Sequence, residues 1–223
     1  MIKAVFIDVD NTLLDFNRCS ALSIKAALAD YGFEYDDSMF PVFKRINDSL
    51  WNKIEKGELT REGLFKIRWN MIFKELDIPL DGVEFEKVYH DYLNCSTEKV
   101  QGADELLAYL YPKYTVCVTS NAHYEQQIKR LHDSGLDRFL HHIFISDKIG
   151  FPKPSAAFFD ACFDELDGIS PDEVIVIGDS PTADIDGGRN YGMKTCFFNF
   201  AHTDEIIEAD YTVNSLAEIM NIL

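Results

Sequence analysis

The sequence predicts an α/β protein whose core is a doubly wound, Rossmann-like parallel sheet with an inserted bundle of helices. Two observations predict this fold. Short apolar runs typical of strands alternate with helical patterns over most of the chain, and one long stretch near the amino terminus shows helical periodicity alone. With 223 residues, 47% of them hydrophobic, the chain is long and apolar enough for one large domain or one domain carrying an insertion.

Five segments have the composition expected of parallel strands that are covered on both faces. Most are short, continuous and rich in Val, Ile or Phe. They span residues 4–7, 115–119, 143–146, 174–177 and 195–198. Helical patterns lie between them, for example the apolar stripe within residues 158–166. The alternation predicts crossover helices on both faces of the sheet.

The stretch from residue 17 to about residue 96 carries four apolar stripes of helical spacing, with breaks at Gly32, Pro41, Gly57 and Pro79. About four helices inserted directly after the first strand predict a helical cap over its carboxyl end. We therefore expect an α/β core domain formed by 1–16 and 97–223 and a cap domain formed by 17–96, with the reactive site between them. The alternative is that these helices only cover the sheet.

The first strand ends in two carboxylates, Asp8 and Asp10, followed by Asn11 and Thr12. Side chains two positions apart in a strand lie on the same side, here at the carboxyl edge where open α/β sheets bind ligands. One carboxylate can act as a nucleophile and the other can move a proton, and both can hold a hard cation through oxygen. An ordinary Asp/Asn turn would be the better interpretation of this motif alone.

Two further motifs offer groups that could bind an anion. Ser120 and Asn121 follow the second strand, where a hydroxyl, an amide and the backbone N–H groups of the next helix can bind phosphate oxygens. Helix capping by these residues is the alternative. Lys153 stands between two prolines just before a helix, where a cation is electrostatically unfavourable unless an anion lies opposite it. An exposed loop lysine is the alternative.

The fourth motif supplies the last two acids. Asp179 follows the strand at 174–177 and is placed to bind a metal, and Asp184 is placed for a supporting or direct role. Asp184 could instead be an acid in the first turn of a helix, where the helix dipole stabilises it. Asp186 and Glu173 are interpreted as surface charges.

The net charge argues against certain partners, and the cysteines indicate the redox state of the core. A net charge of −17 disfavours partners with a nucleic-acid backbone or an anionic membrane surface, and it requires a local cation or metal for any anionic substrate. The five cysteines are scattered without a Cys-x-x-Cys pair, and Cys117, Cys162 and Cys196 lie in apolar segments, as expected of reduced core thiols. No signal peptide or membrane-spanning run is visible, so we expect a cytoplasmic protein.

The four motifs, in this order and spacing, resemble the haloacid dehalogenase-like (HAD) hydrolase superfamily. The resemblance implies that Asp8 is a nucleophile that becomes a phospho-aspartate and that Asp10 is the acid and base. It implies that Ser120 and Lys153 bind the phosphoryl group. It also implies a Mg²⁺ ion held by the carboxylates of Asp8 and Asp179 and the backbone carbonyl of Asp10. Asp184 would support this arrangement, and we expect Asn11, Thr12 and Asn121 to contact substrate.

The resemblance narrows the reaction and leaves the substrate open. Dehalogenases of the family typically lack the second aspartate and need no metal, so Asp10 and Asp179 favour a phosphatase. The segments 13–16 and 150–154 and the size of the cap are similar to a 5′-nucleotidase branch, which acts on nucleoside monophosphates, often pyrimidine ones. Phe16, Trp51 and Trp69 are candidates for stacking on a base. Phosphatases of sugar phosphates or phosphoglycolate, phosphomutases and a phospho-ligand-binding module remain alternatives.

Overall fold

The computed structural model describes residues 1–223, which divide into two compact units. The core unit comprises Met1–Phe16 and Thr97–Leu223, and the helical unit comprises Asn17–Ser96. None of the helices is both long and apolar enough to cross a membrane.

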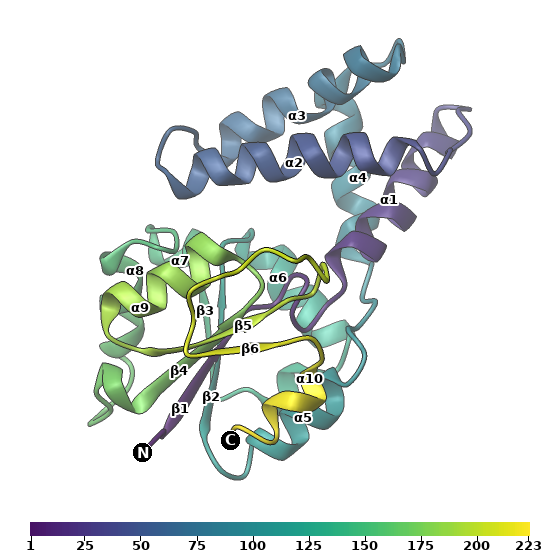
Figure 1. The fold of residues 1–223 in the computed structure, drawn as a ribbon. Helices are drawn as coiled ribbons and strands as arrows, with labels where there is room; N and C mark the ends of the chain where they lie inside the picture. Colours follow the sequence, from purple (N-terminus) through teal and green to yellow (C-terminus); the bar gives the residue numbers. More distant parts are fainter. The chain divides into compact units, whose positions relative to one another are not determined.

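The core unit is built on one sheet of six parallel strands in the order β3-β2-β1-β4-β5-β6 (Figure 1). The strands are β1 (Ala4–Ile7), β2 (Thr115–Ser120), β3 (His142–Ile145), β4 (Val174–Gly178), β5 (Lys194–Phe198) and β6 (Tyr211–Val213). This order confirms the predicted doubly wound sheet, because the direction in which the strands follow one another across the sheet reverses between β1 and β4.

Five of the six strands coincide with the predicted ones to within one residue at each end, and the sequence prediction missed β6. This strand has only three residues, and Tyr211 and Thr212 are exposed at the edge of the sheet. A short, exposed edge strand needs no continuous apolar run, so it lacks the pattern that predicted the others.

Helices cover both faces of the sheet, and the alternation of side chains along β1 shows how. Val5 and Ile7 pack into an apolar cluster with α5 (Ala103–Leu110) and α10 (Leu216–Ile219), whereas Ala4 and Phe6 pack with α8 (Ala156–Phe163) on the other face. The helices of the core unit are α5 (Ala103–Leu110), α6 (Tyr124–Asp133), α7 (Ser146–Ile149), α8 (Ala156–Phe163), α9 (Gly187–Tyr191) and α10 (Leu216–Ile219), with single turns η1 (Asp137–Phe139), η2 (Pro171–Glu173) and η3 (Pro181–Asp186).

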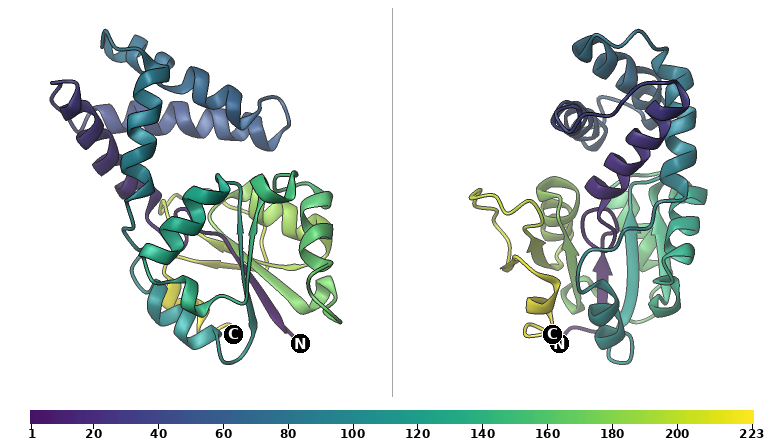
Figure 2. Two further views of the ribbon diagram at one scale, coloured as in Figure 1. Left: turned by 180° about the vertical axis from the view of Figure 1, so that it is seen from behind. Right: turned by 90° about the vertical axis from the view of Figure 1, so that its right-hand side faces the viewer.

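The three cysteines predicted for the core, Cys117, Cys162 and Cys196, are free and buried, which confirms that prediction. Both ends of the chain lie together at the amino-terminal edge of the sheet (Figure 2). The opposite edge, where the strands end, is therefore the part of the core unit that the four sequence motifs approach.

The helical unit contains the four helices expected for this stretch of sequence. They are α1 (Phe16–Asp30), α2 (Met39–Glu55), α3 (Arg61–Leu76) and α4 (Gly82–Asn94). Trp69 is 1% exposed and packs against Phe43, Phe85 and Tyr89, with ring centroids 4.5–5.5 Å apart. Its ring faces are covered by these neighbours, so the hypothesis that Trp69 stacks on a substrate base is wrong.

One buried ion pair ties these helices together. The guanidinium of Arg68 on α3 donates to both carboxylate oxygens of Glu86 on α4, at 2.5 and 3.2 Å, and to Asn47 on α2 at 2.8 Å. It also lies 5.1 Å from the ring centre of Tyr89. Burial raises the pKa of Glu86, although the Arg68 charge opposes that shift. A charge buried in this way is tolerable because nearly every polar contact around it is satisfied.

The first turn of α4 generates a stability prediction, because the backbone of α3 approaches Gly82 closely. A Cβ at Gly82 would lie 2.3 Å from the backbone nitrogen of Asn70 and 2.7 Å from the carbonyl carbon of Trp69. We expect Gly82→Ala to lower the free energy of unfolding by about 1–3 kcal/mol, because the two helices must separate.

The matched control is Gly63→Ala, whose Cβ would meet the flexible side chain of Leu59. Alanine is favoured over glycine in a helix by about 1 kcal/mol, so this variant is expected to be neutral or stabilising. Thermal and denaturant unfolding measure both variants. Equal stability of the two variants would contradict the close packing of α3 on α4.

Candidate active site

The strand order brings three of the four motifs together. β1 lies between β2 and β4, and its last residue, Ile7, pairs with Val118 and Ile177. Asp8, Ser120 and Asp179 therefore emerge side by side at the carboxyl edge of adjacent parallel strands. This is the edge, next to the point where the winding reverses, at which open α/β sheets bind ligands.

The loop after β1 is fixed by its own backbone and by apolar anchors. The amide of Asp8 donates to the carbonyl of Ile177 at 2.9 Å, which extends the ladder by one residue. The backbone nitrogens of Leu13 and Leu14 each donate to the carbonyl of Val9 at 2.8 Å, and all three side chains are fully buried. Asn11 has a φ of 61°, a left-handed conformation that Asn adopts more readily than most residues.

Lys153 is the centre of the site. Although its side chain is a cation, the residue is only 1% exposed. Its Nζ donates to Asp8 Oδ1 at 2.8 Å, to Asp184 Oδ1 at 2.6 Å and to the carbonyl of Thr119 at 2.9 Å. An ammonium has three protons, and all three are used. Burial alone lowers the pKa of Lys153, but the carboxylates of Asp184 and Asp8 outweigh it and the pKa is raised.

Asp184 is held from two sides. Its Oδ1 accepts from Lys153, and its Oδ2 accepts from the amide of Ser180 at 3.1 Å. The side chain lies directly against the backbone of Gly178, where a Cβ would approach Oδ2 to 2.1 Å. The glycine at the end of β4 is therefore required for Asp184 to reach Lys153. Asp184 also lies in the first turn of η3, and its contact with the Ser180 amide caps that helix. A first-turn acid would not need the contact with Lys153, so that contact favours the supporting role.

Three carboxylates converge around this single lysine. Oxygen atoms of Asp8, Asp179 and Asp184 all lie within 4.8 Å of one another. Burial raises the pKa of Asp8 to about 7; Lys153 opposes this shift, and the charge on Asp184 adds to it. Burial, together with the charges of Asp8 and Asp184, raises the pKa of Asp179 well above its usual value. Three carboxylates face one ammonium, so negative charge accumulates here beyond what Lys153 neutralises, and the hard carboxylate oxygens could hold a divalent cation.

Ser120, in the second motif, already forms hydrogen bonds within the protein. Ser120 Oγ accepts from the amide of Ala122 at 3.2 Å and from Gln127 Nε2 at 3.0 Å. Since both contacts use its oxygen as acceptor, neither of them uses the hydroxyl proton of Ser120, which can donate to a bound anion. The amide of Tyr124, at the start of α6, donates to Asp147 at 3.0 Å, so it is not available to an anion as the sequence had suggested.

Asn121 lies against the backbone of Lys153. Its Oδ1 accepts from the Lys153 amide at 2.8 Å, and its Nδ2 donates to the Lys153 carbonyl at 3.0 Å. Both ends of the Asn121 side-chain amide thus hold the lysine segment in place, and the contact of Asn121 with substrate stays a prediction. Thr12 is fully buried, and its Oγ1 has no hydrogen-bond partner, which is the kind of polar atom that a bound oxyanion or water satisfies.

Two further residues of the site, Arg130 and Gln127 on α6, escaped the sequence prediction. Both contact Asp10: Arg130 Nη1 donates to Oδ1 at 2.6 Å, and Gln127 Nε2 donates to Oδ2 at 2.8 Å. The available signal was spacing, because Gln127 stands four residues before Leu131, a buried residue of the same helix. A polar residue at a core position of an amphipathic helix implies a buried polar partner.

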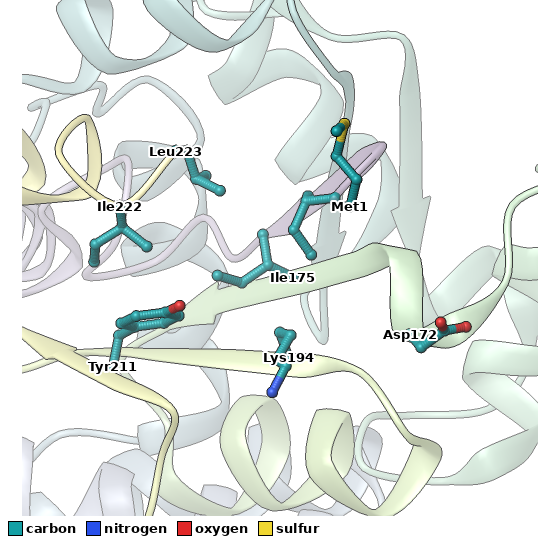
Figure 3. Close-up of a pocket in the computed structure, with 8 residues that line it drawn as sticks. Met1, Asp172, Ile175, Lys194, Tyr211, Ile222 and Leu223 are labelled. Carbon is teal, nitrogen blue, oxygen red and sulfur yellow. The ribbon is translucent and has the colours of Figure 1, made fainter.

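A pocket with a volume of about 230 Å³ lies elsewhere in the core unit (Figure 3). Met1, Asp172, Lys194 and Tyr211 line it together with the last residues of the chain. These residues belong to the amino-terminal ends of the strands, opposite to the edge that carries Asp8. The pocket therefore does not belong to the candidate active site.

The chain is similar to known proteins in both sequence and structure. Residues 2–192 match the family model described as haloacid dehalogenase-like hydrolase. The HAD-hydrolase YfnB of Bacillus subtilis is 33% identical over 99% of this chain and 95% of its own length. The crystal structure of YfnB bound to magnesium covers 100% of this chain and 98% of the YfnB chain with a TM-score of 0.93.

Two further relatives carry names of specific phosphatases. The pyrimidine 5′-nucleotidase PynA of Streptococcus pneumoniae is 29% identical over 99% of this chain and 94% of its own length. The glyceraldehyde 3-phosphate phosphatase of Pyrococcus furiosus is 26% identical over 100% of this chain and 93% of its own length.

The raised pKa of Asp8 generates a prediction about stability. Its pKa is about 7 in the folded protein and 3.8 in the reference state, so the folded state binds this proton more tightly. Its stabilising contribution is complete below about pH 4 and is lost as the pH rises through about 7. In metal-free protein at about pH 8 we therefore expect Asp8→Asn to raise the melting temperature by about 5 °C or more.

The measurement is thermal unfolding in chelator and in excess Mg²⁺, at about pH 5 and about pH 8. Mg²⁺ should stabilise the unsubstituted protein at the higher pH and have a much smaller effect on Asp8→Asn. Asp186→Asn is the control, because Asp186 forms an exposed ion pair with Arg189 outside the cluster. A melting temperature of Asp8→Asn below that of the unsubstituted, metal-free protein at the higher pH would contradict the predicted accumulation of charge.

Proposed function

The chain belongs to the haloacid dehalogenase-like hydrolase family, and we propose that it is a magnesium-dependent phosphatase that acts on small phosphate monoesters through a phospho-aspartate. The observation that carries the proposal is the buried contact of Lys153 with Asp8 and Asp184, with Asp179 beside it and Asp10 two residues along the same loop. This arrangement combines a nucleophile, an acid, a cation and a set of hard oxygen ligands.

The first half of the reaction assigns roles to Asp8 and Asp10. A carboxylate oxygen of Asp8 attacks phosphorus, and the bond from phosphorus to the ester oxygen breaks. The electron pair of that bond goes to the leaving oxygen, which takes the proton of Asp10 and departs as an alcohol. The hydroxyl of Ser120 binds the phosphoryl oxygens, and Lys153 binds them once the proton that it donates to Asp8 turns to a phosphoryl oxygen. Charge on these oxygens must be balanced throughout the transfer.

The second half regenerates the enzyme. Asp10, now a carboxylate, takes a proton from water as the water oxygen attacks phosphorus. The bond between phosphorus and Asp8 breaks, its electron pair returns to the Asp8 carboxylate, and inorganic phosphate leaves. The residues present suit a Mg²⁺ ion, which the carboxylates of Asp8 and Asp179 and the Asp10 carbonyl would hold with support from Asp184. When bound, the ion would supply positive charge next to the phosphoryl oxygens.

For the substrate we propose a nucleoside 5′-monophosphate. Two observations support this choice: the similarity to PynA over nearly the whole chain, and the segments 13–16 and 150–154 that resemble the nucleotidase branch. Within this proposal the helical unit selects the substrate as a cap, and Asn11 and Thr12 contact it. A sugar phosphate is the second candidate, favoured by the similarity to the glyceraldehyde 3-phosphate phosphatase.

The test is phosphate release from a panel of nucleoside monophosphates, sugar phosphates and phosphoglycolate, with Mg²⁺ and with chelator. We expect metal-dependent release that favours nucleoside monophosphates. Asp8→Asn should lower turnover by more than about 10³-fold, because the nucleophile is removed. Asp186→Asn, the same change at an exposed ion pair, should retain turnover. Acid-quenched protein should carry the phosphoryl group on the peptide that contains Asp8.

Each other outcome rejects a defined part of the proposal. Preference for a sugar phosphate would retain the mechanism and reject the nucleotidase assignment. Full activity in chelator would reject the metal. Absence of release from every substrate would reject the phosphatase and favour a phosphomutase or a phospho-ligand-binding module.

A further inference from the structure

Two buried polar side chains of α6 reach across to the loop after β1. Gln127 is completely buried and Arg130 is 1% exposed, whereas the side chain of their common target, Asp10, is 27% exposed. Arg130 Nη1 donates to Asp10 Oδ1 at 2.6 Å and Gln127 Nε2 donates to Asp10 Oδ2 at 2.8 Å. Each oxygen of the carboxylate therefore has its own donor, and the rotation of the Asp10 side chain is fixed.

The two donors also hold each other. Arg130 Nη1 donates to Gln127 Oε1 at 3.1 Å, which leaves Gln127 Nε2 directed at Asp10 and at Ser120 Oγ. The reverse orientation of the amide would face its oxygen to a carboxylate and its NH₂ group to a guanidinium, and both contacts would be repulsive. Arg130 thus determines the orientation of Gln127, and Gln127 links Asp10 to the hydroxyl expected to bind phosphate.

The neighbouring residue Lys129 shows that this arrangement is not required by the helix. Lys129 forms an exposed ion pair with Asp133 one turn along α6, as is common on helix surfaces. Burial of Arg130 and Gln127 carries a desolvation cost that apolar residues of similar size would avoid. Attachment of α6 to the sheet does not explain this cost. Nor does it explain why both side chains converge on one catalytic carboxylate.

We propose that Arg130 and Gln127 are positioning residues that hold the Asp10 carboxyl group in the orientation needed for proton transfer to the leaving oxygen. The inference rests on the proposed phosphatase function, in which Asp10 is the acid. Neither residue touches the reacting phosphoryl group in this scheme. Their effect passes through Asp10, and through Ser120 in the case of Gln127.

This role makes the effect of a substitution depend on the leaving group. An alkoxide is a poor leaving group and needs the proton of Asp10, whereas p-nitrophenolate leaves readily without one. Loss of a positioning residue should therefore slow hydrolysis of an alkyl phosphate far more than hydrolysis of p-nitrophenyl phosphate. General damage to the site would slow both substrates alike.

The experiment compares kcat and KM for p-nitrophenyl phosphate with those for the alkyl phosphate that the unsubstituted enzyme hydrolyses fastest. For Arg130→Gln we expect kcat to fall by about 10²-fold or more on the alkyl phosphate and by less than about 10-fold on p-nitrophenyl phosphate, with KM little changed. Arg130→Lys retains the charge and should recover most of the lost kcat. Lys129→Gln, one residue away on the exposed side of α6, is the control for the helix.

A double variant tests whether Arg130 acts through Asp10 or contributes to turnover independently of it. If Arg130 acts through Asp10, Arg130→Gln in an Asp10→Asn background should cause little further loss on the alkyl phosphate. Gln127→Met preserves the volume of the side chain and removes the contacts with Asp10 and Ser120 without altering a charge. The loss through Ser120 falls on both substrates, so the additional loss on the alkyl phosphate measures the part that passes through Asp10. It therefore decides the question if Arg130→Gln does not fold, as judged by thermal unfolding.

The contradicting outcomes are distinct. Equal losses on both substrates, or losses that multiply in the double variant, would overturn the positioning role and leave the phosphatase assignment intact. Unchanged kinetics in both Arg130→Gln and Gln127→Met would do the same. Absence of phosphate release from the unsubstituted enzyme would overturn the phosphatase assignment, and the positioning role with it.

Discussion

The candidate active site depends on one buried ammonium group. Lys153 Nζ contacts a side chain after β1, a backbone carbonyl at the end of β2 and a side chain after β4. No other single group in the site joins three adjacent strand ends. A buried cation is tolerable only when all of its protons are paired. Burial of Lys153 therefore requires the acids to converge around it.

That constraint explains why several small features of the core unit are necessary. Gly178 must lack a side chain so that Asp184 can lie against its backbone. The side-chain amide of Asn121 forms two hydrogen bonds with the backbone of Lys153. The anchors of the first loop, including Leu13 and Leu14, keep Asp8 and Asp10 in register with the strand. A sheet edge is not rigid by itself, and these contacts make it a preorganised site.

The site contains two buried ion pairs that play different parts. The contact of Lys153 with Asp8 and Asp184 lies in a cluster where burial, and after it the charges of the neighbouring carboxylates, raise the pKa of Asp8 and Asp179. A bound cation would be favourable there. The contact of Arg130 with Asp10 joins one cation to one carboxylate, and Gln127 supports it. The first pair is thus suited to binding a cation, and the second to fixing the orientation of the Asp10 carboxylate. The helical unit has a pair of the second kind in Arg68 and Glu86, which holds three of its helices together.

The sequence alone determined the fold class, five of the six strands, the helical insertion and the residues of the four motifs. Each of these depends on local pattern: apolar runs, helical spacing, or polar residues at the end of a strand. The prediction of Lys153 came from an electrostatic conflict visible in one short segment, since a cation at a helix start needs an anion opposite it.

Tertiary structure alone decided the partners. Sequence could not show that Asn121 binds the Lys153 backbone, that Trp69 is enclosed by other rings, or that Gln127 and Arg130 face Asp10, more than a hundred residues away. It also missed β6, a short and largely exposed edge strand that pairs only with β5. The reason is the same in each case. Local pattern records whether a side chain is to be buried, and only the packing of distant segments determines which group it meets.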